Sequence, residues 1–261
     1  MKRILRLHLV QFPTRAGHAL ETLRAIERDL AKLRVRRDDW LVFPEMWPSG
    51  FSLQERDRLR RENTRCADWL RDFARGHACY LVGSMLELRG GKAYNQAYVV
   101  GPSGRRLAAY RKIHLFEYGG EHLRFERGRK VVAFSSPWGR LGLAICYDLR
   151  FPELFRRLSA AGARLIFVPS AWPRERIDHF SSLLKARAIE NQCYIVGLNK
   201  VGPGMHREPV VYGGHSAVFG PWGEQLAELG SRKEIRSVSL PLDAVEKIRV
   251  RYPFLRSRIL A

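Results

Sequence analysis

Three side chains able to act together in nucleophilic chemistry each stand beside an apolar stretch of the sequence. Glu45 follows the apolar residues 41–43, Cys146 follows the apolar residues 141–145, and Lys112 lies in a partly apolar segment. A strand that ends in a sharp turn exposes a nucleophile and leaves the next backbone N–H groups free to bind an oxyanion. A thiol with a pKa of about 8.5 is mostly protonated at neutral pH, so Cys146 would need a base and a compensating cation. Glu45 and Lys112 are candidates for these two roles.

Each of the three residues also has a simpler interpretation. A cysteine at the end of a strand is usually a small buried apolar side chain, and a lysine near aromatic residues usually extends to solvent. A proline followed by a glutamate after a strand is often only a turn. The occurrence of all three in one chain is what favours catalysis.

Alternating strands and helices are expected around these residues. Period-2 alternation or short apolar runs predict strands at 4–10, 40–43, 80–88, 93–100, 141–145, 165–168, 193–198, 216–219 and 225–228. Apolar residues at three- and four-residue spacing predict helices at 17–34, 67–75, 152–161 and 178–191. Because no Ser/Pro/Gly-rich linker divides the chain, we expect a single α/β domain.

The composition is typical of one globular domain and argues against several classes of protein. The chain has 261 residues, 46% of them hydrophobic, and its longest apolar runs are far shorter than the roughly 20 residues of a membrane span. The four cysteines are widely spaced and form no CxxC pair, so neither a disulfide framework nor a zinc site is expected. We expect a cytoplasmic protein with reduced thiols, no metal and no other cofactor.

The net charge of +20 comes from 46 Lys and Arg residues against 26 Asp and Glu residues. The basic residues are scattered and often alternate with acidic ones, whereas a nucleic-acid-binding tract would cluster them. We therefore interpret the charge as a solvated surface and expect neither a nucleic acid nor a membrane as partner. The one local concentration, residues 247–258, also contains aromatic residues and predicts a tail that packs.

In their order along the chain these motifs resemble those of the nitrilase, or carbon-nitrogen hydrolase, superfamily, and the resemblance covers nearly the full length. It implies that Glu45, Lys112 and Cys146 form a Glu-Lys-Cys triad and that Glu121 is a further catalytic-site glutamate. Members of the family often have Phe-x-Pro-Gly after that glutamate. Here Arg127 replaces the proline, so the geometry of this loop does not follow from the resemblance.

Within the superfamily the motifs are most similar to the ω-amidase-like branch. The matching segments are 146–153, 170–173, 186–192, 197–202, 214–216 and 221–224. The resemblance implies a single-domain four-layer αββα sandwich, with residues 1–261 as one carbon-nitrogen hydrolase domain. It also implies a homodimer or higher homo-oligomer formed through the helices, and the tail at about 247–261 is expected to pack on the partner subunit.

An ω-amidase hydrolyses the terminal amide of a short α-keto acid, such as 2-oxoglutaramate, to the acid and ammonia through a cysteine thioester. The resemblance therefore implies a small-molecule amide as substrate. Because arginine binds a carboxylate through two parallel hydrogen bonds, Arg150 and Arg174 are candidates for binding the far carboxylate. Tyr147, Phe116 and Trp172 are candidates for the apolar wall of the pocket.

Three alternatives remain open at this point. The same Glu-Lys-Cys machinery would also serve another small amide, such as deaminated glutathione or an N-carbamoyl compound, or a nitrile. A Cys-His hydrolase would use His114, His179 or His215 as its base instead of Glu45. A non-catalytic nucleic-acid-binding protein would explain the positive charge and would not need Cys146.

Overall fold

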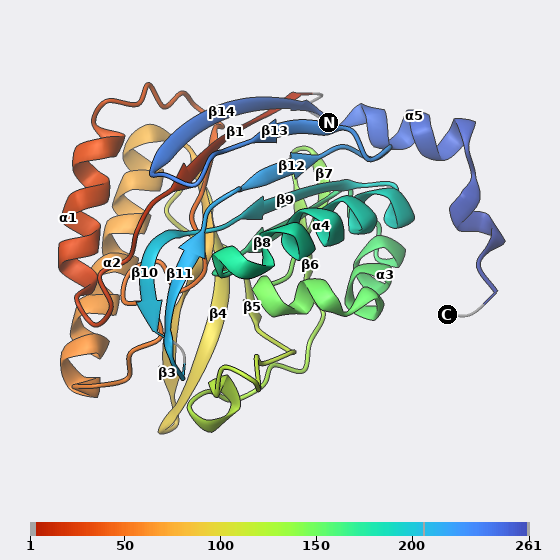
Figure 1. The fold of residues 1–261 in the computed structure, drawn as a ribbon. Helices are drawn as coiled ribbons and strands as arrows, with labels where there is room; N and C mark the ends of the chain where they lie inside the picture. The colour runs from red at the N-terminus through yellow and green to blue at the C-terminus, as the bar shows by residue number, and fades with distance from the viewer. Residues whose placement is uncertain (1–3, 206, 260–261) are drawn as a thin grey trace.

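Two six-stranded β-sheets lie face to face in the computed structural model of the chain, which describes residues 4–205 and 207–259 (Figure 1). The order of the first sheet is β14 (Glu234–Pro241), β1 (Ile4–Gln11), β2 (Trp40–Val42), β3 (Tyr80–Arg89), β4 (Lys92–Val100) and β5 (Arg106–Arg111). The order of the second sheet is β13 (Gln225–Glu228), β12 (Ala217–Phe219), β9 (Tyr194–Leu198), β8 (Leu165–Pro169), β7 (Gly139–Leu143) and β6 (Ala133–Ser136). Strands β1 to β3 run parallel, as do β7 to β9, and the other neighbours pair antiparallel.

Side chains from both sheets form the apolar core between them. Alternation along β1 directs Leu5, Leu7 and Leu9 into this core, where all three are fully buried. Trp40 of the first sheet stacks on Phe167 of the second, with ring centroids 5.2 Å apart. Burial of such large rings stabilises the facing sheets, whose strand ends carry the candidate site.

Two helices cover the outer face of each sheet. Helices α1 (Ala19–Leu30) and α2 (Arg56–His77) pack on the first sheet, and α3 (Pro152–Ala160) and α4 (Ile177–Asn191) pack on the second (Figure 1). Leu23, Ile26 and Leu30 are buried on α1 at three- and four-residue spacing, as the apolar stripe in the sequence predicts. The arrangement is the expected αββα sandwich.

The remaining elements lie at the edges of the sandwich. They are the two-stranded sheet of β10 (Val201–Met205) and β11 (Pro209–Gly213), the 3₁₀ helices η1 (Glu121–Leu123), η2 (Cys146–Arg150), η3 (Arg174–Arg176) and η4 (Phe254–Ser257), and helix α5 (Asp243–Arg251). Helix α5 and the segment after it project from the body (Figure 1). They contain the tail expected at 247–261, of which residues 260 and 261 lie outside the described part. Within residues 4–205 and 207–259, no helix has the length and hydrophobicity of a membrane span.

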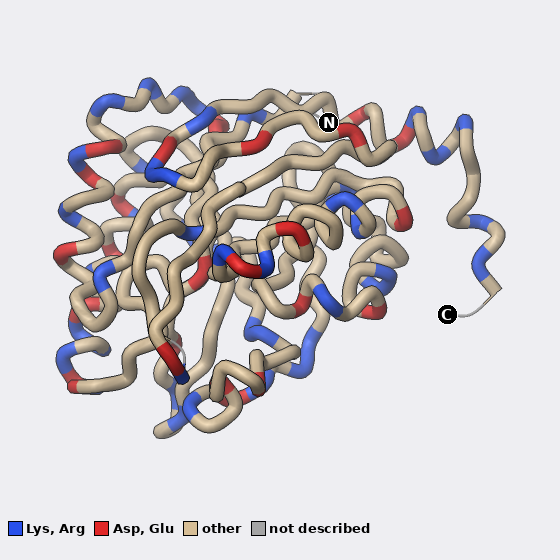
Figure 2. Tube along the Cα trace, viewed as in Figure 1, with Lys and Arg blue, Asp and Glu red and all other residues tan. Residues whose placement is uncertain are grey.

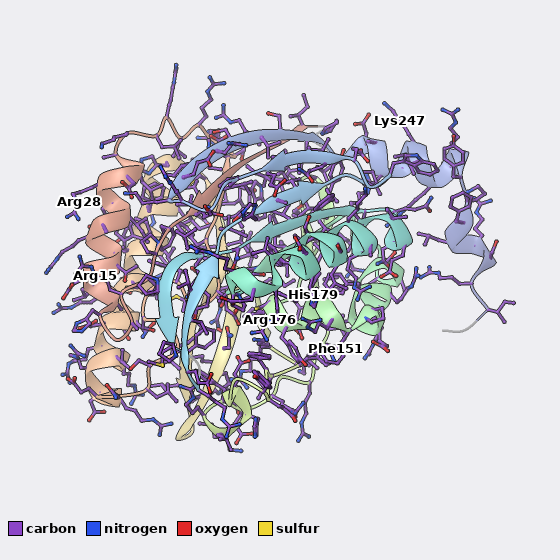
Figure 3. The ribbon with its side chains drawn as sticks, in the orientation of Figure 1. Arg15, Arg28, Phe151, Arg176, His179 and Lys247 are labelled. Atoms are coloured by element: carbon purple, nitrogen blue, oxygen red, sulfur yellow. The ribbon has the colours of Figure 1, made fainter. Side chains whose placement is uncertain are left out.

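Charged residues are spread over the molecule. Figure 2 shows Lys and Arg on helices, loops and strand ends, with Asp and Glu between them. Arg15, Arg28 and Lys247 are exposed and lie near the periphery (Figure 3). Several basic side chains pair with acidic neighbours one helical turn away, such as Lys247 with Asp243 at 2.8 Å.

Candidate active site

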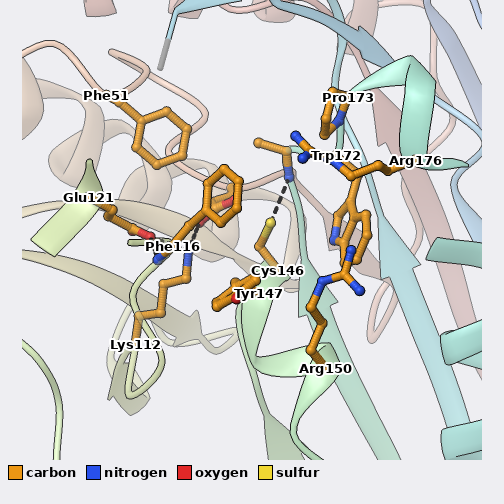
Figure 4. A pocket seen from close by; sticks show the side chains of 12 residues that line it. Phe51, Lys112, Phe116, Glu121, Cys146, Tyr147, Arg150, Trp172, Pro173 and Arg176 are labelled. Atoms are coloured by element: carbon orange, nitrogen blue, oxygen red, sulfur yellow. Dashed lines mark hydrogen bonds and ion pairs between the residues drawn. The ribbon is translucent and has the colours of Figure 1, made fainter. Parts of the chain in front are cut away.

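Segments that follow strands of both sheets meet at one pocket (Figure 4). Glu45 lies in the loop after β2 and Lys112 directly follows β5, both in the first sheet, whereas Cys146 begins η2 after β7 of the second sheet. The pocket has about 350 Å³ of space, part of it open to solvent. Its lining residues are Glu45, Phe51, Lys112, Phe116, Glu121, Cys146, Tyr147, Arg150, Ala171, Trp172, Pro173 and Arg176. The three residues of the expected triad thus line one pocket, although they come from distant parts of the sequence.

Two unusual backbone positions direct the reactive side chains. Cys146 and Met46, the residue after Glu45, each have a φ of 47°, in the left-handed region that residues other than glycine rarely adopt. Hydrogen bonds hold both turns. The Met46 N–H donates to Ser84 Oγ at 2.8 Å, and the Ala171 N–H donates to Cys146 Sγ at 3.5 Å. The sulfur therefore lies at a sharp strand end, as the sequence predicts.

Lys112 lies between two buried carboxylates. Its Nζ donates hydrogen bonds of 2.8 Å to Glu45 Oε1 and 2.8 Å to Glu121 Oε2, and all three side chains are at most 3% exposed. Asn95 Nδ2 donates to both carboxylates, at 2.7 Å from Glu45 Oε1 and 3.3 Å from Glu121 Oε1. Glu45 Oε2 is buried and has no hydrogen-bond partner among the described residues, so this oxygen is available to accept a proton.

One further contact fixes this cluster, which consists of Glu45, Lys112 and Glu121. Glu121 Oε2 also accepts a hydrogen bond of 2.7 Å from the Phe116 N–H, which joins the cluster to the loop that carries Phe116. Asn95 was missed by the sequence reasoning. Its only signal is a polar residue at a buried position of the predicted strand 93–100.

Burial and charge act in opposite directions on the titratable groups. Burial raises the pKa of Glu45; Lys112 opposes this shift and Glu121 adds to it. Burial alone would lower the pKa of Lys112, but the carboxylates of Glu121 and Glu45 outweigh it, and this pKa lies well above its ordinary value. Burial, and then the Glu45 carboxylate, raise the pKa of Cys146. The resting site is therefore a neutral thiol beside a carboxylate that binds protons more strongly than an exposed glutamate does.

Two arginines lie on the opposite side of Cys146 from Lys112 (Figure 4). The Arg150 guanidinium is 4.7 Å from the Trp172 ring centroid, and the Arg176 guanidinium is 5.4 Å from the Phe116 ring centroid. In the part of the chain that the structure describes, neither arginine forms an ion pair with a carboxylate. The mouth of the pocket thus carries two positive charges without a negative partner.

Arg174, expected to bind the substrate, does not line the pocket. It is the first residue of η3 and its side chain is exposed, whereas Arg176 on the same short helix lines the pocket. Successive residues of a 3₁₀ helix point about 120° apart, so the position of the lining arginine depends on a helix that the sequence did not reveal. The expected wall residues Tyr147, Phe116 and Trp172 do line the pocket.

Two other chemistries find no support in the geometry. None of His114, His179 and His215 lines the pocket. His114 Nδ1 lies 2.7 Å from Asp148 Oδ1, and His215 Nδ1 lies 2.9 Å from Glu228 Oε1, so both rings have partners elsewhere. Across residues 4–205 and 207–259, no group of three or more His, Cys, Asp or Glu side chains is arranged to hold a metal ion.

Comparison with known proteins gives a family for this fold and pocket. The family described as carbon-nitrogen hydrolase matches residues 9–250. The chain is 35% identical to the 2-oxoglutaramate amidase of Bacillus subtilis, over 94% of this chain and 93% of the relative. It is 39% identical to the deaminated glutathione amidase of Synechocystis, over 65% of each chain. A solved CN-hydrolase superfamily protein from Xanthomonas campestris has a TM-score of 0.88 and 27% identity, with 100% of this chain and 99% of that chain covered. The chain therefore belongs to the carbon-nitrogen hydrolase family and is a hydrolase of amide carbon–nitrogen bonds.

Proposed function

We propose that the enzyme is an ω-amidase that hydrolyses the terminal amide of a short α-keto acid. In this proposal Cys146 is the nucleophile, Glu45 is the general base and acid, and Lys112 offsets the negative charge that develops. One observation carries the proposal: Glu45 Oε2, buried without a hydrogen-bond partner among the described residues, lies in the same pocket as the Cys146 thiol.

The first half-reaction forms a thioester. The Cys146 sulfur attacks the amide carbon, its proton passes to Glu45, and the carbonyl electrons move to oxygen. Lys112 and the Tyr147 N–H stabilise this oxyanion, because the first N–H groups of a helix such as η2 have no acceptor within the helix. Glu45 then gives the proton to the amide nitrogen, the C–N bond breaks, and ammonia leaves.

The second half-reaction releases the acid. A water molecule attacks the thioester carbon while Glu45 accepts one of its protons. The oxyanion collapses, the C–S bond breaks, and the proton on Glu45 returns to the Cys146 sulfur. Glu121 and Asn95 keep Lys112 and Glu45 aligned through both halves, with hydrogen bonds between 2.7 and 3.3 Å.

The mouth of the pocket favours an amide whose far end is anionic. Arg150 and Arg176 supply two guanidinium groups, and Phe116, Tyr147 and Trp172 supply the apolar walls. A guanidinium binds a carboxylate through two parallel hydrogen bonds, so this pair can orient the carboxylate of a 2-oxoglutaramate-like substrate while its amide faces the thiol. The similarity to a 2-oxoglutaramate amidase supports the same substrate.

A substrate panel tests this assignment. The acid product would be measured by mass spectrometry after incubation with 2-oxoglutaramate, deaminated glutathione, an N-carbamoyl amino acid, a nitrile and a short neutral amide. We expect the highest kcat/KM for 2-oxoglutaramate, with an acyl adduct on Cys146 in the intact-protein mass. A higher kcat/KM for the neutral amide would contradict the role given to the arginines.

Deaminated glutathione is the second candidate substrate. The Synechocystis relative is named for it. Like 2-oxoglutaramate, the compound is an α-keto acid with an amide at its far end. It is longer than 2-oxoglutaramate, so the pocket would also have to hold the larger group on its amide nitrogen. A kcat/KM for deaminated glutathione above that for 2-oxoglutaramate would establish this alternative.

We also propose a homodimer or higher homo-oligomer. Exposed apolar side chains near α4 and the C-terminal elements support a contact with a second copy, since Ile189, Trp222, Val250 and Phe254 are 48%, 50%, 72% and 61% exposed. Light scattering should give at least twice the chain mass of 30.1 kDa. A fully active monomer would refute the proposal. A cytoplasmic location stays a prediction, based on the four unpaired cysteines.

A further inference from the structure

Lys200 is a buried cation next to the active site that the mechanism above does not use. It follows β9 and is 1% exposed. Its Nζ lies 5.5 Å from the ring centroid of Phe51 and 5.2 Å from that of Tyr212. Phe51 lines the catalytic pocket and also the neighbouring cavity that Lys200 lines. Phe51 thus separates the Lys200 ammonium from the catalytic pocket.

The backbone of Lys200 is tied to the wall of the catalytic pocket. Asn199 Oδ1 accepts hydrogen bonds from the Trp172 N–H at 2.7 Å and from the Lys200 N–H at 3.0 Å. The Lys200 carbonyl accepts a hydrogen bond of 3.0 Å from the Gly214 N–H. These bonds fix the position of the Lys200 backbone relative to the pocket wall.

A buried ammonium needs negative charge nearby, because leaving water costs free energy. Among the residues described, no carboxylate forms an ion pair with Lys200 Nζ, and the carboxylate that acts most on its charge is Glu45. The Glu45, Lys112 and Glu121 cluster holds two carboxylates and one ammonium. A second ammonium balances the remaining negative charge.

We propose that Lys200 is the second cation of the active site and a positioning residue whose charge keeps Glu45 ionised, ready to accept the thiol proton. The inference rests on the role proposed above for Glu45. Loss of a neighbouring positive charge makes a carboxylate easier to protonate. Without the Lys200 charge, less of the enzyme would hold Glu45 as a base at a given pH.

Other titratable and charged groups lie around Lys200 or in the neighbouring catalytic pocket. Burial raises the pKa of Tyr212 and of Cys146, and the pKa of Lys112 lies well above its ordinary value. Arg124, a permanent cation, lines the same cavity as Lys200. Burial lowers the pKa of Lys200 to about 8, so Lys200 is the group of this set expected to lose its proton in weakly alkaline solution.

The test is the pH profile of kcat/KM from about pH 5 to about pH 10, with the best amide from the panel. Lys200→Arg, which keeps the positive charge, should keep the acidic limb of the wild type. Lys200→Met should move the acidic limb up by about one unit and lower kcat/KM about tenfold at about pH 6. Lys130→Met, which removes one positive charge from an exposed position, should give the same pH profile as the wild type.

The result that overturns the inference is a folded Lys200→Met enzyme with the limbs of the wild type. A purely structural role would lower the melting temperature without moving either limb. If Lys200→Met does not fold, Lys200→Gln, which also lacks the charge, takes its place: a folded Lys200→Gln with the acidic limb of the wild type overturns the inference. High activity in Glu45→Gln, measured alongside, would instead contradict the proposed function.

Discussion

The Lys112 cluster and the Arg150–Arg176 pair lie on opposite sides of the Cys146 sulfur and hold their charges differently (Figure 4). In the cluster, an ammonium is bonded at 2.8 Å to each of two carboxylates that water barely reaches. The two arginines are partly exposed, and no ion pair with a carboxylate is seen for them in the described chain. Proton transfer needs an acceptor in a fixed position, while recognition needs charge that is still free to bind. The Lys112 cluster meets the first requirement and the arginine pair meets the second.

The largest effect is expected from removing the Cys146 sulfur, which lies between the two regions. We expect Cys146→Ala to lower kcat/KM by about 10⁴-fold or more, because neither region can form a bond to the substrate. Cys66→Ala is the control. Burial raises the pKa of Cys66 to about 12, it lies away from the pocket, and its loss should leave kcat/KM within about twofold. Near-normal hydrolysis by Cys146→Ala would remove the sulfur from the mechanism.

A second change removes the proton acceptor alone. Glu45→Gln should lower kcat/KM about 10³-fold and slow the reaction of Cys146 with iodoacetamide, since the amide cannot take the thiol proton. In the wild type, peptide mass mapping should find the label on Cys146 before Cys66, Cys79 and Cys193, which do not line the pocket that contains Glu45. Glu126→Gln, which removes the carboxylate of the exposed Lys92–Glu126 ion pair, should be labelled on Cys146 at the same rate as the wild type.

A third change tests the buried cluster through stability. Lys112→Met leaves two carboxylates buried without their cation and should destabilise the fold by about 3–5 kcal/mol near neutral pH. Their pKa in the folded state would then exceed the unfolded value, so stability is present at low pH and is lost as pH rises. Melting temperatures should fall from about pH 5 to about pH 8. Arg176→Met, at the exposed mouth, should change stability by no more than about 0.5 kcal/mol.

The smallest effect is expected from replacing the two arginines at the mouth of the pocket. Arg176→Met and Arg150→Met should raise KM for 2-oxoglutaramate about 10- to 100-fold, because a charged hydrogen bond is lost, with kcat nearly unchanged. KM for a neutral amide should not rise. Arg174→Met, the exposed neighbour on η3, should match the wild type. A loss of kcat equal to the rise in KM would place these arginines in the chemistry instead.

Elements with strong apolar periodicity were predictable from the sequence, and those at the edges were not. The predicted strands 165–168 and 225–228 coincide with β8 and β13 within one residue. Helix α2 begins at Arg56, well before the predicted 67–75, because its first turns carry mostly charged residues around one buried apolar side chain, Leu59. Strands β5 and β14 were not predicted, since their exposed positions do not follow a clean alternation.

The residues of the candidate site also fall into a group that the sequence predicted and a group that it did not. Glu45, Lys112 and Cys146 were predicted from residue type and from the order of the motifs, which are local features. Asn95 and Arg176 depend on register and on a short helix, and neither is visible in a single sequence. Which side chains share a buried volume is decided by packing between sheets, so the partners of the triad emerge only with the fold.

Strand β1 pairs along its whole length with β14, from Ile4 opposite Pro241 to Gln11 opposite Glu234. Gln11 also donates hydrogen bonds to the carbonyls of Gly230 and Arg232. During translation one backbone edge of β1 therefore stays open until β14 has been made, and such an edge can recruit other chains. Folding on the ribosome therefore cannot complete this sheet until β14 has been made.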